Sequence, residues 1–217
     1  MGMKIRSVES RQDGNGVPTP REIASASENP EIVSVPKRRC LAIDGHGSPG
    51  DEAFQQAIAA LYGTAYALKF SRKKAGKHDF KIGPLEGHWA ADVPAGTTER
   101  PPESTWRWRL RIGVPADVTH DELEHNKREV VTKKHGKLVG SPTVPHVFVE
   151  SIPAERVGRV LHVGPYADEP ASFARIAAVL ERAGLKPAPT HIEVYLNDPR
   201  RARPAALRTV LLRQLAA

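Results

Sequence analysis

Two residues in the stretch HIEVYLN, at 191–197, have side chains that suit chemistry: Glu193 and Tyr195. Side chains alternate along a β-strand, so the carboxylate and the phenol share one face, and the aliphatic residues take the other. The aliphatic face suits packing against helices, whereas a carboxylate on a covered face needs a partner, because burying an unpaired charge is costly. A carboxylate beside a phenol fits recognition of a cation or activation of a water molecule as general base.

A second glutamate, Glu86, lies in GPLEGHWAAD at 83–92, where a histidine and a tryptophan follow it. In a regular strand Glu86 and His88 share one face, and Trp89 takes the opposite one. Gly87 allows a β-bulge that breaks this alternation, so the pattern leaves open whether Glu86 or Trp89 enters a pocket. A solvent-exposed strand end is the alternative for Glu86.

The segment STWRWRLRIG at 104–113 alternates tryptophan and aliphatic residues with arginines at a period of two. This predicts a strand with one aromatic face, which carries Trp106 and Trp108, and one cationic face. Core packing is the ordinary role of such tryptophans, and contact with a ligand is the alternative. An arginine of the cationic face offers Glu193 an ion pair, which would make that glutamate structural.

Helices must position these strands, and the sequence predicts two related ones. Apolar residues at steps of three and four give a helix over residues 51–71, and a second such helix follows Asp168. The stretches FQQAIAALYG (54–63) and FARIAAVLERAG (173–184) resemble each other, and each follows a predicted strand and precedes two more. We therefore expect an α+β fold in which an extra helix, opening at Thr119, joins two β-α-β-β units. Their antiparallel sheets would carry helices on one face and a ligand cleft on the other.

The domain organisation follows from the first 31 residues, which are polar and rich in Gly, Pro and Ser and predict a flexible N-terminal tail. Residues 32–217 are then expected to form one folded domain. Within it, VFVESIP (147–153) and RVGRVLHVG (156–164) are separated by two residues and predict a β-hairpin.

The composition narrows the function classes. The single cysteine, Cys40, rules out an internal disulfide and fits a cytoplasmic protein, and no apolar run reaches the roughly 18 residues of a membrane span. The net charge is +7, but the basic clusters carry no interleaved aromatic residues, so no nucleic-acid partner is expected. The nine histidines show no metal-ligand spacing, and the sequence has no phosphate-binding glycine loop. We expect no metal and no cofactor.

Five stretches, taken together, resemble the GyrI-like small-molecule-binding family in its stand-alone form. They are CLAIDGHGSPGDEAFQQAIAALYGTAYALKF, PLEGHWAAD, TWRWRLRI, LHVGPYADEPASF and HIEVYLNDPRRARPAALRTVLLRQ, and they span nearly all of residues 33–214. The resemblance implies a tandem β-α-β-β fold of the SHS2 type, in agreement with the internal repeat.

The resemblance also implies a ligand cleft between the two halves, with aromatic walls and a buried glutamate. The motif match makes that glutamate Glu193, with Tyr195 beside it as its candidate catalytic partner. The further residues that the match assigns to ligand binding are Glu86, Trp89, Trp106, Trp108 and Tyr66. Relatives have two consecutive aromatic residues after the LEG of this motif, whereas this chain has His88 and Trp89. His88 therefore joins the ligand-binding candidates as a titratable group.

The function implied by the resemblance is binding of hydrophobic or aromatic small molecules, including cationic ones, in a cytoplasmic monomer or homodimer. The alternative is catalysis, because some stand-alone relatives are cyclopropanoid cyclopropyl hydrolases. These enzymes open the strained ring of DNA-alkylating compounds with water and so detoxify them. A carboxylate would activate the water, and a tyrosine or histidine would polarise the substrate carbonyl. The residues fit both functions.

Overall fold

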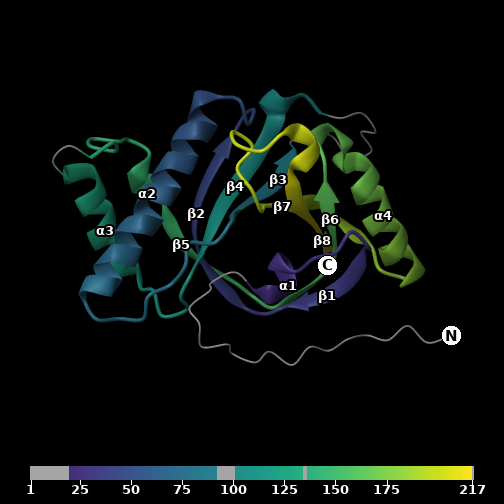
Figure 1. Cartoon of the computed structure of the whole chain (residues 1–217), viewed down its shortest axis with the longest axis horizontal. Helices are drawn as coiled ribbons and strands as arrows, with labels where there is room; N and C mark the ends of the chain where they lie inside the picture. The colour runs from purple at the N-terminus through teal and green to yellow at the C-terminus, as the bar shows by residue number, and fades with distance from the viewer. Residues whose placement is uncertain (1–19, 92–100, 134–135, 217) are drawn as a thin grey trace.

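An eight-stranded antiparallel sheet carries the helices in the computed structural model, which describes residues 20–91, 101–133 and 136–216 (Figure 1). Within these ranges the strand order is β1-β6-β8-β7-β3-β4-β2-β5. The strands are β1 (Glu31–Val35), β2 (Arg38–His46), β3 (Leu85–Ala91), β4 (Trp106–Val114), β5 (Phe148–Ile152), β6 (Glu155–Val163), β7 (Pro187–Tyr195) and β8 (Arg208–Leu215). The α-helices are α1 (Arg21–Ala24), α2 (Glu52–Lys74), α3 (His120–Thr132) and α4 (Glu169–Arg182). Among the described helices, none combines the length and the apolar character that crossing a bilayer requires.

Two copies of a β-α-β-β unit make up most of the fold, which confirms the predicted α+β class and the repeat. The first unit contains β2, α2, β3 and β4, and the second contains β6, α4, β7 and β8. α3 lies between them in sequence and begins after Thr119, where the extra helix was expected to open. As its N-cap, Thr119 accepts a hydrogen bond from the Glu122 backbone N–H at 3.2 Å. The two units meet at the centre of the sheet, where β3 pairs antiparallel with β7.

Each long helix covers the outer strands of its own unit. α2 buries an apolar stripe that recurs at three- and four-residue steps, and it packs against β2 and β4 of the sheet and against α3. α4 packs on β6 and β8, where Ile176 and Leu180 meet Val160 and Leu211. The side of the sheet that carries α2 and α4 is the helix face, and its centre, over β3 and β7, lies between the two helices (Figure 1).

The sheet curls until its two ends meet. β1 and β2 stand near opposite ends of the strand order, yet only Pro36 and Lys37 separate them, which leaves about 10 Å of extended chain for the connection. Pro153 and Ala154 make the same kind of connection between β5 and β6. β5 pairs with β2, and β6 pairs with β1 and β8, so the predicted hairpin is wrong. At both connections the chain continues from one end of the sheet to the other.

The other side of the sheet, the inner face, is enclosed by the curl. Buried side chains fill the enclosed space. One half holds an apolar cluster made of Ile23, Val35, Val157, Leu161, Ile192, Val194, Val210 and Leu212. The other half holds buried charges, among them Arg38 and Glu86, whose side chains form an ion pair at 3.2 Å. The aliphatic side of β7 thus packs in this cluster and not against α2 or α4, contrary to the expectation.

Residues 20–31, which the sequence pattern assigned to the flexible tail, contribute to the inner face. α1 is a single turn, and its Ile23 is fully buried in the apolar cluster. The Ser27 carbonyl accepts a hydrogen bond from the Leu161 backbone N–H at 2.7 Å, which fixes the approach to β1. The folded part therefore begins before residue 32, and residues 1–19 of the predicted tail lie outside the described ranges.

Candidate functional site

The site is built on the central pair of strands. In the β3–β7 register, Gly87 lies opposite Glu193, and Trp89 lies opposite His191. Because paired residues share a face, these residues and Tyr195, two positions beyond Glu193, point to the helix face. The pairing of β3 is regular on both sides, so no bulge interrupts the alternation. The sequence pattern left open whether Glu86 or Trp89 faces the pocket, and this register places Trp89 on the helix face.

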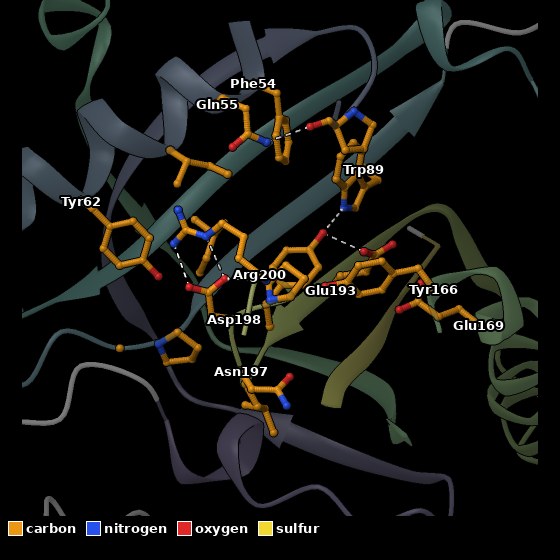
Figure 2. Close-up of a pocket in the computed structure, with 18 of the residues that line it drawn as sticks. Phe54, Gln55, Tyr62, Trp89, Tyr166, Glu169, Glu193, Asn197, Asp198 and Arg200 are labelled. Carbon is orange, nitrogen blue, oxygen red and sulfur yellow. Dashed lines mark hydrogen bonds and ion pairs between the residues drawn. The ribbon is translucent and has the colours of Figure 1, made fainter. Parts of the chain in front are cut away.

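A cavity of about 880 Å³ lies on the helix face, between α2 and the start of α4 (Figure 2). The side chains that line it include Phe54, Gln55, Ile58, Tyr62, Ile82, Leu85, Trp89, Trp106, Tyr166, Glu169, Glu193, Tyr195, Leu196, Asn197, Asp198 and Arg200. Its position differs from the expectation of a cleft on the face opposite the helices. The curl of the sheet fills that face, whereas α2 and α4, each centred on its own unit, leave this space between them.

A chain of hydrogen bonds crosses the floor of the cavity. The Trp89 indole Nε1–H donates to the Tyr195 hydroxyl oxygen at 3.1 Å, and that hydroxyl donates to Glu193 Oε2 at 2.7 Å (Figure 2). The other carboxylate oxygen, Oε1, lies 2.9 Å from His191 Nε2. Because an indole is only a donor, it orients the hydroxyl proton of Tyr195 toward the carboxylate. Both oxygens of Glu193 are therefore held in place.

The tyrosines of the cavity keep their protons at neutral pH. Burial, followed by the neighbouring Glu193 carboxylate, raises the pKa of Tyr195 well above its usual range. Burial and the carboxylates of Glu169 and Glu193 raise the pKa of Tyr166 to about 12. Tyr195 is thus a hydrogen-bond donor to Glu193 and not a second negative charge beside it.

Aromatic rings form the walls of the cavity. Trp89 stacks on Phe54 of α2 with ring centroids 5.6 Å apart, and it meets Trp106 edge to face at 5.7 Å. On the other side, Tyr166 meets Tyr195 edge to face at 6.0 Å. Such edge-to-face and offset contacts fix ring orientation. The walls are flat aromatic surfaces, and the Glu193 carboxylate lies between them on the floor of the cavity.

The segment after β7 carries charges to the rim of the cavity. Arg200 and Asp198 form an ion pair at 2.8 Å, and hydrogen bonds from Arg200 lower the pKa of Asp198 to about 2 (Figure 2). Tyr62 of α2 also lines the rim, and burial followed by the neighbouring Tyr66 raises its pKa. Asp-Pro-Arg-Arg at 198–201 is an ordinary turn composition, which by itself does not indicate that side chains of this segment line a cavity.

Glu86 does not reach the cavity, in contrast to its assignment by resemblance. It is fully buried on the inner face, where Arg38 donates to its Oε2 at 3.2 Å. Arg38 is also buried, and it donates to Glu155 at 3.1 Å. The regular alternation of β3 places Glu86 opposite to Trp89, so it is neither a cavity residue nor an exposed strand end. Its role in this structure is that of a buried ion-pair partner.

Tyr66 and Trp108 lie beside the cavity and not in it. Tyr66 is one helical turn beyond Tyr62, and each four-residue step rotates about 40° around the helix, which carries Tyr66 onto the outer surface with 46% of its area exposed. Trp108 is buried on β4 directly across from Trp89 of β3, and it meets Phe54 edge to face at 5.1 Å. Trp108 packs against Phe54 in the core, which is the ordinary role that the sequence pattern gave to this tryptophan.

His88 is half-buried on the inner face, and its protonation makes the free energy of unfolding depend on pH. Burial, followed by the charges of Arg111 and Arg109, lowers the pKa of His88 to about 4. In an unfolded chain its pKa is about 6.5, so between these values the unfolded chain binds a proton that the folded chain rejects. Above about pH 6.5, His88 is neutral in both the folded and the unfolded chain and does not reduce stability. As the pH falls from 6.5 toward 4, the unfolded chain takes up the proton first, and stability is lost.

We expect the urea midpoint of the wild type to fall more between pH 7 and pH 4.5 than that of His88→Gln, which cannot bind this proton. Urea unfolding of both proteins at these two pH values checks the prediction. Equal losses in the two proteins would contradict it, because all other titrating groups are shared.

Gly87 allows Trp89 and Tyr195 to close over the strand. A Cβ at this position would lie 2.7 Å from Trp89 Nε1 and 3.1 Å from the Tyr195 hydroxyl oxygen. Gly87→Ala is therefore expected to displace both side chains and to lower the free energy of unfolding by about 1–3 kcal/mol. Urea unfolding measures the loss, and the indole N–H signal of Trp89 in an NMR spectrum reports the broken bond. Gly50→Ala, whose Cβ meets only Ser48 Oγ at 3.7 Å, is the control; an equal effect would contradict the prediction.

Three residues were not assigned to the site from the sequence: Tyr62 and Tyr166, which line the cavity, and His191, which contacts Glu193. His191 precedes Glu193 by two residues, so strand alternation already placed both on one face, and this was the available signal. Tyr62 lies one helical turn before Tyr66 on α2, and helix packing is the default role of a tyrosine at such a spacing. Tyr166 begins a short 3-10 turn that precedes α4, and such a turn carries no periodic pattern that indicates where a side chain points.

The side chains of the cavity support two kinds of chemistry. In the part of the chain that the structure describes, no group of three or more His, Cys, Asp or Glu side chains is placed to hold a metal ion. The cavity instead offers a fixed carboxylate, Glu193, with a phenol donor beside it and flat apolar walls around it. It suits a flat molecule that carries positive charge, and it also suits a reaction in which a carboxylate accepts a proton.

Comparison with known proteins gives similarity at the level of structure. No family model matches the sequence. No curated protein matches it. The crystal structure of an uncharacterized conserved protein from Listeria innocua is similar with a TM-score of 0.80 and 28% identity, over 90% of this chain and 96% of that one. A hydrolase from Listeria innocua gives a TM-score of 0.78 and 27% identity, over 90% and 96% of the two chains.

A more distant similarity concerns the fold alone. The crystal structure of the EcmrR C-terminal domain has a TM-score of 0.50 and 12% identity, over 86% of this chain and 96% of that domain. The chain therefore shares its fold, over nearly the whole length of each partner, with proteins that include one described as a hydrolase.

Proposed function

We propose that this protein binds flat, hydrophobic small molecules, and preferentially cationic ones, in the cavity between its two halves. The observation that carries the proposal is the position of Glu193. Its carboxylate is largely buried, with 13% of the side chain exposed, on the floor of an aromatic-walled cavity of about 880 Å³. A cation that stacks on aromatic rings next to a carboxylate gains both cation–π and charge attraction. The resemblance of the sequence to the GyrI-like family supports the same function.

Three probes of similar shape and different charge test this proposal. They are N-methylacridinium, which is cationic, 9-methylanthracene, which is neutral, and anthracene-9-carboxylate, which is anionic. Trp89 and Trp106 line the cavity, so quenching of tryptophan fluorescence should report binding of each probe. We expect the cation to bind about tenfold or more tightly than the neutral probe, and the anion to bind most weakly. Absence of quenching with all three, or the tightest binding by the anion, would refute the proposal.

A second candidate function is hydrolytic opening of an electrophilic ring, as in cyclopropanoid compounds. Two observations favour it: the pairing of Glu193 with Tyr195 at 2.7 Å, and the similarity to a protein described as a hydrolase. The water oxygen would form a bond to a cyclopropane carbon while one ring C–C bond breaks, and Glu193 would take the proton of the water. The electron pair of the broken bond would move onto the conjugated carbonyl oxygen of the substrate, which then takes up a proton.

Turnover separates the second function from the first. The protein is mixed with an excess of a cyclopropane-bearing compound of the duocarmycin type, and the ring-opened product is followed by chromatography. Hydrolysis predicts many equivalents of product per protein chain. Binding alone predicts no product above the rate in buffer, together with fluorescence quenching by the intact compound.

A further inference from the structure

His191 is the last residue of the hydrogen-bond chain that runs from Trp89 through Tyr195 to Glu193. Its Nε2 lies 2.9 Å from Glu193 Oε1, on the side of the carboxylate opposite to the Tyr195 hydroxyl. An ionised carboxylate can only accept hydrogen bonds, so the ring nitrogen that faces it must carry the hydrogen. The two side chains are adjacent on the same strand face, since they are two residues apart on β7. His191 is therefore a second donor to the carboxylate, in addition to Tyr195.

The surroundings of His191 hold its ring in this orientation. The ring meets Phe173 of α4 edge to face, with centroids 4.7 Å apart. On β8 its cross-strand neighbour is Arg213, whose guanidinium lies 5.1 Å from the centre of the Phe173 ring. Arg213 also donates to the backbone carbonyl of Thr190 at 3.2 Å, and so it is engaged away from the carboxylate. Within the described ranges, the ion-pair contact of Glu193 is with His191 and not with an arginine or lysine.

We propose that His191 is a positioning residue, which orients the Glu193 carboxylate toward the cavity through its Nε2–H. With donors on both oxygens the plane of the carboxylate is fixed; with Tyr195 alone it is free to turn about its last side-chain bond. The inference rests on the proposed function, because it assigns His191 a role through Glu193. The alternative is a packing role, in which the His191 ring only contacts Phe173 and does not orient Glu193.

Two substitutions separate these roles, because each keeps one property of His191 and removes the other. His191→Phe keeps an aromatic ring against Phe173 and removes the N–H donor. His191→Gln loses the ring and keeps an N–H near the position of Nε2. The positioning role predicts that His191→Phe lowers the affinity for N-methylacridinium by about tenfold or more, and that His191→Gln retains most of it. A packing role predicts the reverse order, and that order would overturn the proposal.

A double-substitution cycle tests whether the effect passes through Glu193. In a Glu193→Gln background the charged acceptor is gone, so His191→Phe is expected to change the affinity by less than about twofold. A loss that is as large in this background as in the wild type would overturn the proposal.

The outcome is separable from that of the proposed function. If the wild type binds none of the three probes, the proposed function fails, and the same cycle is then measured by urea unfolding without ligand. Coupling between the two positions in that measurement would support His191 as the residue that holds Glu193. Additive effects on unfolding would overturn it.

Discussion

Replacing Glu193 with glutamine is expected to abolish the preference for N-methylacridinium over 9-methylanthracene. If the protein hydrolyses cyclopropanoid compounds, the same change is expected to slow ring opening by about 10²- to 10⁴-fold, the range that general-base catalysis contributes. Glutamine keeps the size of the side chain and an acceptor for the Tyr195 hydroxyl, but it carries no charge and accepts no proton from water. Fluorescence titration and product chromatography measure the two effects.

The control for this variant is Glu181→Gln, which removes the same charge from an exposed position on α4. We expect both affinity and turnover of this control to equal those of the wild type. If Glu193→Gln still prefers the cation, or still turns substrate over at the wild-type rate, Glu193 is not the residue that recognises charge or activates water.

The second large effect concerns stability and the inner face. Arg38→Met is expected to lower the free energy of unfolding by about 3–5 kcal/mol, because it leaves Glu86, which has no exposed surface, without its charged partner. The double variant Arg38→Met/Glu86→Met is expected to regain most of this loss, because it replaces a buried ion pair with apolar side chains of similar size. Urea unfolding of the two variants and the wild type measures both effects.

Arg156→Met serves as the matched control, because Arg156 is exposed on β6. Its effect should stay within about 0.5 kcal/mol, as for other surface substitutions. Exposed ion pairs contribute less than about 1 kcal/mol to stability. A loss that small for Arg38→Met would therefore contradict the assignment of Arg38 and Glu86 as a buried pair. Glu86→Gln should also leave the affinity for N-methylacridinium unchanged, since Glu86 lies on the face away from the cavity.

Local patterns predicted most of the elements and which side chains of a strand share a face. The alternation of tryptophan and arginine in β4 holds in the structure, with Trp108 buried on the helix face and Arg109 on the opposite one. The same rule placed Glu193 and Tyr195 together, because a period of two is a property of a single strand. The internal repeat predicted the order of the elements, because each unit repeats its apolar spacing.

The side of the sheet that holds the cavity could not be predicted in this way. It depends on the curl, and the curl depends on pairs such as Glu31 with Arg159, which are far apart in sequence. Alternation says that Glu86 and Trp89 lie on opposite faces, but only these long-range pairs decide which face is filled. Ile23 was missed for a related reason: a four-residue helix is too short to show an apolar period, and the burial of Ile23 is decided by strands elsewhere in the chain.

If the cavity binds a ligand as proposed, the central β3–β7 pair makes that binding a property of the joined halves. Trp89 comes from the first unit, and Glu193 and Tyr195 come from the second, so a chain in which only one unit has folded possesses no site. A ligand therefore stabilises the docking of the halves as well as the fold of each, by about 2.7 kcal/mol at a concentration of 100 times Kd. Separation of β3 from β7 would release the ligand and open the sheet in one step. A bound ligand would thus hold together the two β-α-β-β units at the β3–β7 pairing.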